Sequence, residues 1–276
     1  MFKKFLLLSA AWLLCLLPLR AQFYIGVHGG VTLPTGYYGD SRMSDNEWMM
    51  TEGHQLRAGA GTGFSGGVDF SYSMPFLNDL SVLFSVDFLQ SGPNKDVRNY
   101  YNGTFAKRYE NYDDYEMILP KYRNIPILLG LRYSYPLGTF YDLYGEAQMG
   151  VNIRQLTAWQ LSFASGEFKT DDGVLPSYTY KETYAYEDRV TLAFHLGAGI
   201  MIRDIVSVGA GVHLLGKAPL SWDNTVTTSY NTPGGKHEGS ATDHRDYTDM
   251  NPTMVFINLG FHINPFKNYT RRVQEN

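Results

Sequence analysis

The feature that most constrains this sequence is the stretch from Asn124 to Tyr135, in which apolar side chains occupy every second position. Side chains alternate between the two faces of a β-strand, so one face of this strand is wholly apolar. The other face is small, polar and partly charged, and it carries Arg132. Strands of water-soluble sandwiches turn such an apolar face inward, whereas strands of membrane-spanning barrels turn it towards lipid. The stretch therefore predicts a strand and leaves two architectures open.

Seven further segments repeat this alternation, and the lengths of the gaps between the eight segments also alternate. The seven are 23–31, 64–72, 80–89, 141–152, 190–202, 206–214 and 254–263. Gaps after the odd-numbered segments are long and gaps after the even-numbered ones are short. Bacterial membrane barrels have an even number of strands, short periplasmic turns and longer extracellular loops. The pattern predicts an all-β, eight-stranded antiparallel up-and-down transmembrane barrel over residues 22–264, with a soluble β-sandwich or lipocalin-like barrel as the alternative.

Aromatic residues support the membrane alternative. Six of them are predicted to point outward at the end with the short turns, where they would form the girdle of a membrane interface. They are Phe23, Tyr72, Tyr133, Tyr135, Tyr141 and Phe261. The apolar rows also carry almost no charge, which the outer face of a soluble barrel would need.

The N-terminus indicates export. Lys3 and Lys4 precede an apolar run, and Ala21 is a small residue at a plausible cleavage site, so residues 1–21 are predicted to be a signal peptide and residues 265–276 a short periplasmic tail. The only cysteine, Cys15, lies in the predicted signal, which excludes disulfide and thiol chemistry in the mature chain. Without the signal the acidic residues outnumber the basic ones, which argues against nucleic acid as a partner. The predicted location is the outer membrane, with its lipids as partners, and no cofactor is expected.

Charged residues in the inward rows predict an ion-pair network inside the barrel. A turn at 136–138 would set Arg132 opposite Asp142, or one register step away, with Glu146 above. Asp69 and Asp87 would join from the neighbouring hairpin. Charges in a water-poor lumen need partners, so the network is interpreted as structural.

Two histidines offer a sharper possibility. If Ile202 pairs with Val206, then His195 lies opposite His213 in the lumen. Histidine is a common metal ligand and proton carrier, so metal binding or a proton relay are the alternatives to simple packing. Two ligands are too few for a metal site, and none is predicted.

The long gaps contain two groups of residues that suggest surface contacts. The fourth gap has an acidic and histidine-rich run, predicted to be a solvated surface: His237, Glu238, Asp243, His244, Asp246 and Asp249. The third gap has aromatic residues predicted to continue strands above the membrane: Trp159, Phe163, Phe168, Tyr178, Tyr180, Tyr184 and Tyr186. Exposed aromatic side chains would suit a protein or glycan partner.

The segment Tyr122–Leu129, the strand rhythm and the Ala21-Gln22 end of the signal resemble outer-membrane β-barrel proteins of Bacteroidetes, including the PorT-type group. The stretch Asn258–Phe261 looks like part of the C-terminal assembly signal of such barrels, although this chain does not end on an aromatic residue. The resemblance implies the fold and the location. A role in protein secretion, as in the PorT-type group, is implied by the resemblance alone.

The predicted function is that of a non-catalytic membrane-anchored scaffold that exposes its loops. The alternatives are a PorT-like component of a secretion machine and a lipid-modifying enzyme. Such an enzyme would need a histidine near the lipid face, but the lipid-facing rows contain none. An open porin-like diffusion pore is not expected from eight strands, because side chains fill so narrow a barrel.

Overall fold

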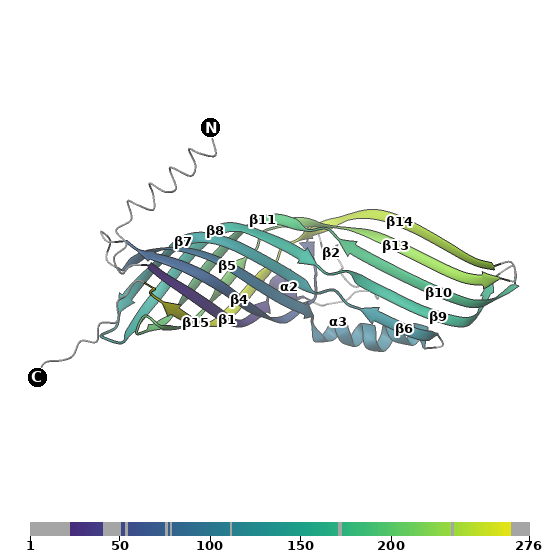
Figure 1. Cartoon of the computed structure of the whole chain (residues 1–276), viewed down its shortest axis with the longest axis horizontal. Helices are drawn as coiled ribbons and strands as arrows, with labels where there is room; N and C mark the ends of the chain where they lie inside the picture. The colour runs from purple at the N-terminus through teal and green to yellow at the C-terminus, as the bar shows by residue number, and fades with distance from the viewer. Residues whose placement is uncertain are drawn as a thin grey trace, which may run out of the picture.

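The computed structural model describes residues 23–40, 51–52, 55–74, 77, 79–110, 112–170, 173–232 and 235–265. The predicted signal segment and residues 266–276 of the predicted tail lie outside this part of the chain. The described residues form a closed barrel and a second sheet beyond one of its ends (Figure 1). None of the helices in the described ranges is both long and apolar enough to cross a membrane.

Eight strands form the barrel, and each pairs antiparallel with its two neighbours. The strands are β1 (Phe23–Pro34), β4 (Ala60–Ser73), β5 (Leu80–Pro93), β7 (Tyr122–Pro136), β8 (Tyr141–Leu156), β11 (Arg189–Ile202), β12 (Val206–Leu214) and β15 (Thr253–Ile263). Pairing of β1 with β15 closes the barrel. The predicted fold class is confirmed, and each strand covers or overlaps its predicted segment.

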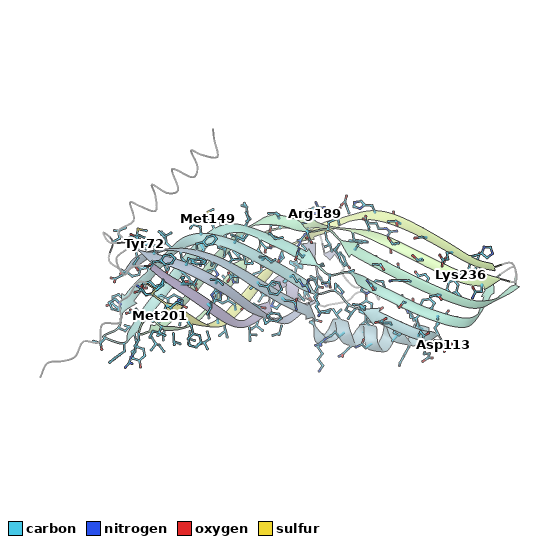
Figure 2. All side chains as sticks on the ribbon, in the orientation of Figure 1. Tyr72, Asp113, Met149, Arg189, Met201 and Lys236 are labelled. Carbon is cyan, nitrogen blue, oxygen red and sulfur yellow. The ribbon has the colours of Figure 1, made fainter. Side chains whose placement is uncertain are left out.

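The barrel wall is apolar outside and small or polar inside. In β11 the outward Val190 and Leu192 are 68% and 65% exposed. The inward Thr191 and Ala193, which alternate with them along the strand, are buried. The same alternation runs around the barrel, so large apolar side chains such as Met149 cover its outer surface (Figure 2). Four of the predicted girdle residues, Tyr133, Tyr135, Tyr141 and Phe261, are exposed at the end with the short connections.

One short connection has the predicted register. In the β11–β12 turn, Arg203 and Asp204 both adopt positive φ, and the Ile205 amide donates to the Ile202 carbonyl at 3.0 Å. Left-handed residues at both central positions suit the twist of a tight hairpin. Ile202 therefore pairs with Val206, as the sequence predicts, and His195 lies opposite His213.

The β7–β8 connection differs from the prediction. Pairing continues through Pro136, which lies opposite Asp142, and the Leu137 amide donates to the Tyr141 carbonyl at 2.7 Å. The connection is therefore longer than the predicted turn at 136–138. As a result Arg132 lies opposite Glu146, and the prediction that it lies opposite Asp142 or one step away is wrong.

The second sheet replaces much of what the sequence predicts as long loops. It has the order β2-β3-β14-β13-β10-β9-β6, and we call it the distal sheet. Its strands are β2 (Thr51–Glu52), β3 (Gln55–Leu56), β6 (Asp113–Ile118), β9 (Trp159–Thr170), β10 (Gly173–Tyr186), β13 (Ala218–Thr232) and β14 (Gly235–Met250). The third long gap is the hairpin β9–β10 and the fourth is the hairpin β13–β14. The aromatic residues of the third gap do continue strands, but the acidic run of the fourth lies in β14 rather than in a loop.

An aromatic core holds the distal sheet together. Short helical turns cover one face of it: α3 (Lys95–Asn99), the π-helical η1 (Tyr100–Phe105) and the 3₁₀ turn η2 (Ala106–Tyr109). The Asn94 side chain caps α3 by accepting from the Val97 amide at 3.0 Å, and Val97 is fully buried. Trp159, Leu161 and Phe163 of β9 complete this core. A fourth short helix, α2 (Gly36–Gly39), inserts Tyr38 at the junction with the barrel.

Candidate functional site: the barrel lumen

The first charged group in the lumen surrounds His28 of β1. Its Nε2 donates to Asp87 of β5 at 2.6 Å, and its Nδ1 lies 3.3 Å from Asp69 of β4. Both carboxylates are almost fully buried. Because both ring nitrogens face carboxylates, the geometry suits an imidazolium that carries a proton on each nitrogen.

A second charged group crosses from β7 to β12. The Arg132 guanidinium donates to Glu146 at 2.8 Å, and the other oxygen of Glu146 lies 2.9 Å from His195 Nε2. His195 Nδ1 in turn lies 3.4 Å from His213 Nδ1. The Arg132 guanidinium also stacks over the Tyr144 ring, 4.9 Å from its centroid. A continuous chain of ion-pair and hydrogen-bond contacts therefore links β7, β8, β11 and β12.

The structure thus brings together four of the five residues predicted for the lumen network. Arg132 and Glu146 form one ion pair, and Asp69 and Asp87 bind His28 instead of an arginine. Asp142 lies outside these contacts and lines a cavity of about 230 Å³ at the end with the short connections. The same cavity reaches Arg132 and His262, so it connects the network with that mouth of the barrel.

At its other end the lumen is closed by an apolar cluster, which we call the plug. Its buried residues are Tyr38, Ala58, Ala60, Leu89, Tyr122, Leu128, Leu156, Ala193, Leu215, Leu220, Met250 and Met254. Beside it, the almost fully buried Arg154 donates to the carbonyls of Ala218, Pro219 and Met250 at 2.8–3.2 Å. These bonds tie β8 of the barrel to the base of the β13–β14 hairpin. Among the described residues, the lumen is therefore a cup that the plug closes at one end and that opens at the mouth with the short connections.

One trio in the lumen has the composition of a hydrolase triad. Ser207 Oγ lies 2.9 Å from His262 Nε2, and His262 Nδ1 lies 3.5 Å from Asp69. However, Asp69 already binds His28, and His262 Nδ1 has no hydrogen bond that would orient the ring. The cavity beside Ser207 measures about 30 Å³, which holds a water molecule or two and no acyl group. The trio is consistent with lumen packing rather than nucleophilic catalysis.

The lumen histidines do not form a metal site in this structure. Among the residues that the structure describes, no group of three or more histidine, cysteine, aspartate or glutamate side chains is arranged so that it could hold a metal ion. His195 and His213 face one another, but the only carboxylate bound to the pair, Glu146, is engaged by Arg132. Their contact is therefore best described as a hydrogen-bonded pair.

Three lumen residues escaped the sequence interpretation: His28 and His262 as ion-pair partners, and Arg154 as a link between barrel and distal sheet. His28 meets Asp87 only because β4 lies between their strands in a particular register. A long gap separates β1 from β4, so no local turn indicates that register. Arg154 could have been noticed as a charge in an inward row near the end of a strand, but its carbonyl partners depend on the β13–β14 hairpin.

Comparisons with known proteins find similar solved structures of outer-membrane barrels. Neisserial surface protein A matches over 88% of this chain and 96% of its own, with 11% identity and a TM-score of 0.37. The outer membrane protein OprG of Pseudomonas aeruginosa matches over 88% and 97%, with 17% identity and a TM-score of 0.36. A major outer membrane protein of Thermus thermophilus matches over 87% and 99%, with 10% identity and a TM-score of 0.37. No protein-family model and no curated protein sequence matches the chain. The assignment of the fold rests on the strand pairing itself.

Proposed function

We propose that the barrel spans the outer membrane and that the chain is a non-catalytic scaffold, which presents the distal sheet outside the cell. The observation that carries this proposal is the apolar outer wall. Exposed large apolar side chains occur on all eight barrel strands, for example Val27, Phe64, Leu129 and Ile257. Soluble monomers rarely expose apolar patches of more than a few hundred square ångströms, whereas a lipid-facing wall requires one.

The orientation follows from the two ends of the barrel. The short connections and the aromatic residues lie at the end where the chain enters and leaves the barrel (Figure 1). Short turns of membrane barrels face the periplasm, which an exported chain reaches first. Tyr72 and Met201 are near this end, and Lys236 marks the far tip of the distal sheet (Figure 2). The distal sheet would then stand on the cell surface.

The distal sheet is suited to contact because it is held firmly and shows an open polar surface. Its aromatic core and the Arg154 bonds fix it to the barrel. In β14, residues 235–246 are exposed, and β14 has only a single paired position with β3 on its outer side. A protein or glycan partner at this surface is part of the proposal.

Single-cysteine labelling tests the placement. The only natural cysteine lies in the predicted signal, so a mature variant carries one thiol where it is introduced. We expect T227C, on β13, to react with a membrane-impermeant maleimide on intact cells, and I205C, in the β11–β12 turn, to react only after the outer membrane is permeabilised. Labelling of I205C on intact cells, or recovery of the chain in the soluble fraction, would overturn the proposal.

Trimming of the distal sheet tests the scaffold role. A variant in which residues 223–244 are replaced by a two-residue turn keeps the Trp222–Arg245 pair at the base of the hairpin. It should still migrate as a folded barrel that shifts on boiling, but lose cross-links to surface partners on intact cells. A variant altered only in the turn at 137–140 is the matched control. Identical cross-links from both variants would contradict presentation by this sheet.

A narrower role as a PorT-like component of a secretion machine is supported only by the sequence resemblance at Tyr122–Leu129. It would predict that the chain co-purifies with other secretion components and that its deletion retains exported proteins in the periplasm. The lipid-modifying alternative predicts altered lipid A on expression. We expect unchanged lipid A by mass spectrometry, since the trio at Ser207 has no room for an acyl chain.

A further inference from the structure

The pair formed by His195 and His213 has a geometry that limits how many protons it can hold. Both rings are almost fully buried, and their Nδ1 atoms face one another at 3.4 Å. The His195 Nε2 is occupied by the Glu146 carboxylate, so that nitrogen carries a proton. The remaining proton-binding position of His195 is therefore the one that faces His213.

One proton fits between the two facing nitrogens, and two do not. With a single proton there, one ring donates to the other, whichever ring carries it. If both rings were imidazolium ions, with a proton on every ring nitrogen, two N–H groups and two positive charges would meet at the distance of a hydrogen bond. Such a contact is repulsive, so full protonation must move one ring away from the other.

The pair lies directly beneath the plug. The Phe256 ring packs against both histidines, with centroids 5.0 Å from His195 and 4.8 Å from His213. His213 is also opposite Met254 in the β12–β15 register, and Met254 is a fully buried plug residue. A displacement of either ring is therefore transmitted to β15 side chains that close the lumen.

Protons can reach the pair from the periplasmic mouth. The mouth cavity and the small inner cavity share Arg132 and His262 as lining residues, and the inner cavity also touches Glu146, His195 and His213. The charged and titratable groups that line the cavity beside the pair are Glu146 from β8, Arg132 from β7, His28 from β1, Asp69 from β4, Asp87 from β5 and His262 from β15. Glu146 is the carboxylate in direct contact with the pair, and Arg132 already shares it, whereas Asp69 and Asp87 bind His28.

We propose that the His195–His213 pair is an acid-sensitive switch, and that protonation of both rings displaces Phe256 and the plug and opens the lumen to ions. At neutral pH the shared proton keeps the cup closed. In acid the barrel becomes an ion-conducting channel. This activity goes beyond the scaffold role and does not depend on what the distal sheet contacts.

Conductance recordings on the purified full chain in planar lipid bilayers test the switch. When the pH is lowered from about 7.5 to about 4.5, across the range in which histidines titrate, we expect the mean conductance of the wild type to rise by about tenfold or more. H213Q and H195Q each remove one of the two facing imidazole rings. Two positive charges can then no longer meet at the pair, so both variants should remain closed at the lower pH. A heat-modifiability gel at each pH establishes that the barrels stay folded.

Two further variants sharpen the result. H244Q removes an exposed histidine of β14 and should respond to acid as the wild type does. H213R places a permanent charge beside His195 and should conduct at neutral pH. A folded wild type that stays closed in acid would overturn the proposal, as would acid opening of H213Q and H195Q equal to that of the wild type. If either glutamine variant fails to fold, the other carries the same prediction.

Discussion

The barrel and the distal sheet are built from the same kind of antiparallel strand, yet they bury opposite kinds of side chain. The barrel encloses ion pairs such as Arg132–Glu146 and exposes leucine and valine. The distal sheet encloses Trp159, Leu161 and Phe163, and exposes charged and hydroxyl side chains along β14. Alternation alone therefore predicts strands but not which face is buried. In the proposed placement, the surrounding medium decides that: lipid surrounds the barrel and water surrounds the distal sheet.

Ion pairs in the two regions differ in how much their side chains are exposed to solvent. The Arg132 and Glu146 side chains are 10% and 7% exposed, whereas those of Lys236 and Glu238 are 61% and 63% exposed. Removal of one partner of a buried pair leaves a charge without solvent or counter-ion. Removal of one partner at the surface leaves a charge in water, which screens it.

The largest expected effect is that of E146Q. It leaves Arg132 without its carboxylate in the lumen, and we expect the free energy of unfolding to fall by about 3–5 kcal/mol. Reversible unfolding in denaturant, followed by tryptophan fluorescence in lipid vesicles, measures the loss. The double variant R132M/E146Q should recover part of the loss, because no unpaired charge remains.

The matched change in the distal sheet is E238Q, which breaks the exposed pair with Lys236. We expect no measurable change in stability by the same assay. Equal losses from E146Q and E238Q would show that the lumen pair is as well solvated as the surface pair, and the contrast between the regions would fail.

An arginine on the barrel wall is the next largest perturbation. Leu196 lies near the middle of β11 and is 54% exposed. In a bilayer, L196R should lower the free energy of unfolding by about 2–4 kcal/mol, as expected near the midplane. T227R on the exposed face of β13 should change it by no more than about 0.5 kcal/mol. A wall that tolerates arginine as well as the distal sheet does would argue against lipid contact.

The smallest effect concerns two tyrosines of the distal sheet at alkaline pH. Tyr180 and Tyr184 both donate to Glu182, at 2.9 and 3.0 Å. Burial and the nearby Glu182 charge raise the pKa of Tyr184 to about 12, and burial and the bond to Glu182 raise the pKa of Tyr180. The unfolded chain ionises its tyrosines near pH 10 and the folded sheet does not, so the sheet should lose stability as the pH rises from about 10 towards 12.

Limited proteolysis and tyrosinate absorbance across that pH range measure this loss. Cleavage should appear first in the β9–β10 hairpin, while the barrel remains heat-modifiable. In E182Q the tyrosines should ionise at lower pH, because the repelling carboxylate is gone. Simultaneous unfolding of barrel and sheet would contradict independent behaviour of the two regions.

The sequence predicts the barrel well because the contrast between its two faces is strong and local. Apolar alternation marks each strand, and the tight turn at Arg203 and Asp204 fixes the register that sets His195 opposite His213. The β7–β8 register was missed because Pro136, which suggests a turn, instead pairs with Asp142 at the end of the ladder. A proline at the end of a strand is compatible with pairing, since only its missing N–H is lost there.

The distal sheet could not be predicted to the same degree. Much of β13 and β14 is rich in threonine, serine and charged residues on both faces, so no period of two separates a buried face from an exposed one. These strands form because they are paired along their length and packed beside the aromatic side chains of β9 and β10. Such pairing depends on tertiary context, which outweighs local propensity in sheets.

The connections between barrel and distal sheet also have a mechanical consequence. Only two residues separate Leu156 from Trp159, Tyr186 from Arg189, and Met250 from Thr253, so three barrel strands run almost directly into strands of the distal sheet. A partner that pulls on the sheet would therefore load the barrel along its strands. Tension in that direction stretches many ladder hydrogen bonds at once instead of opening them one after another. The cell surface would then be able to transmit traction through this chain while its attachment to the membrane holds.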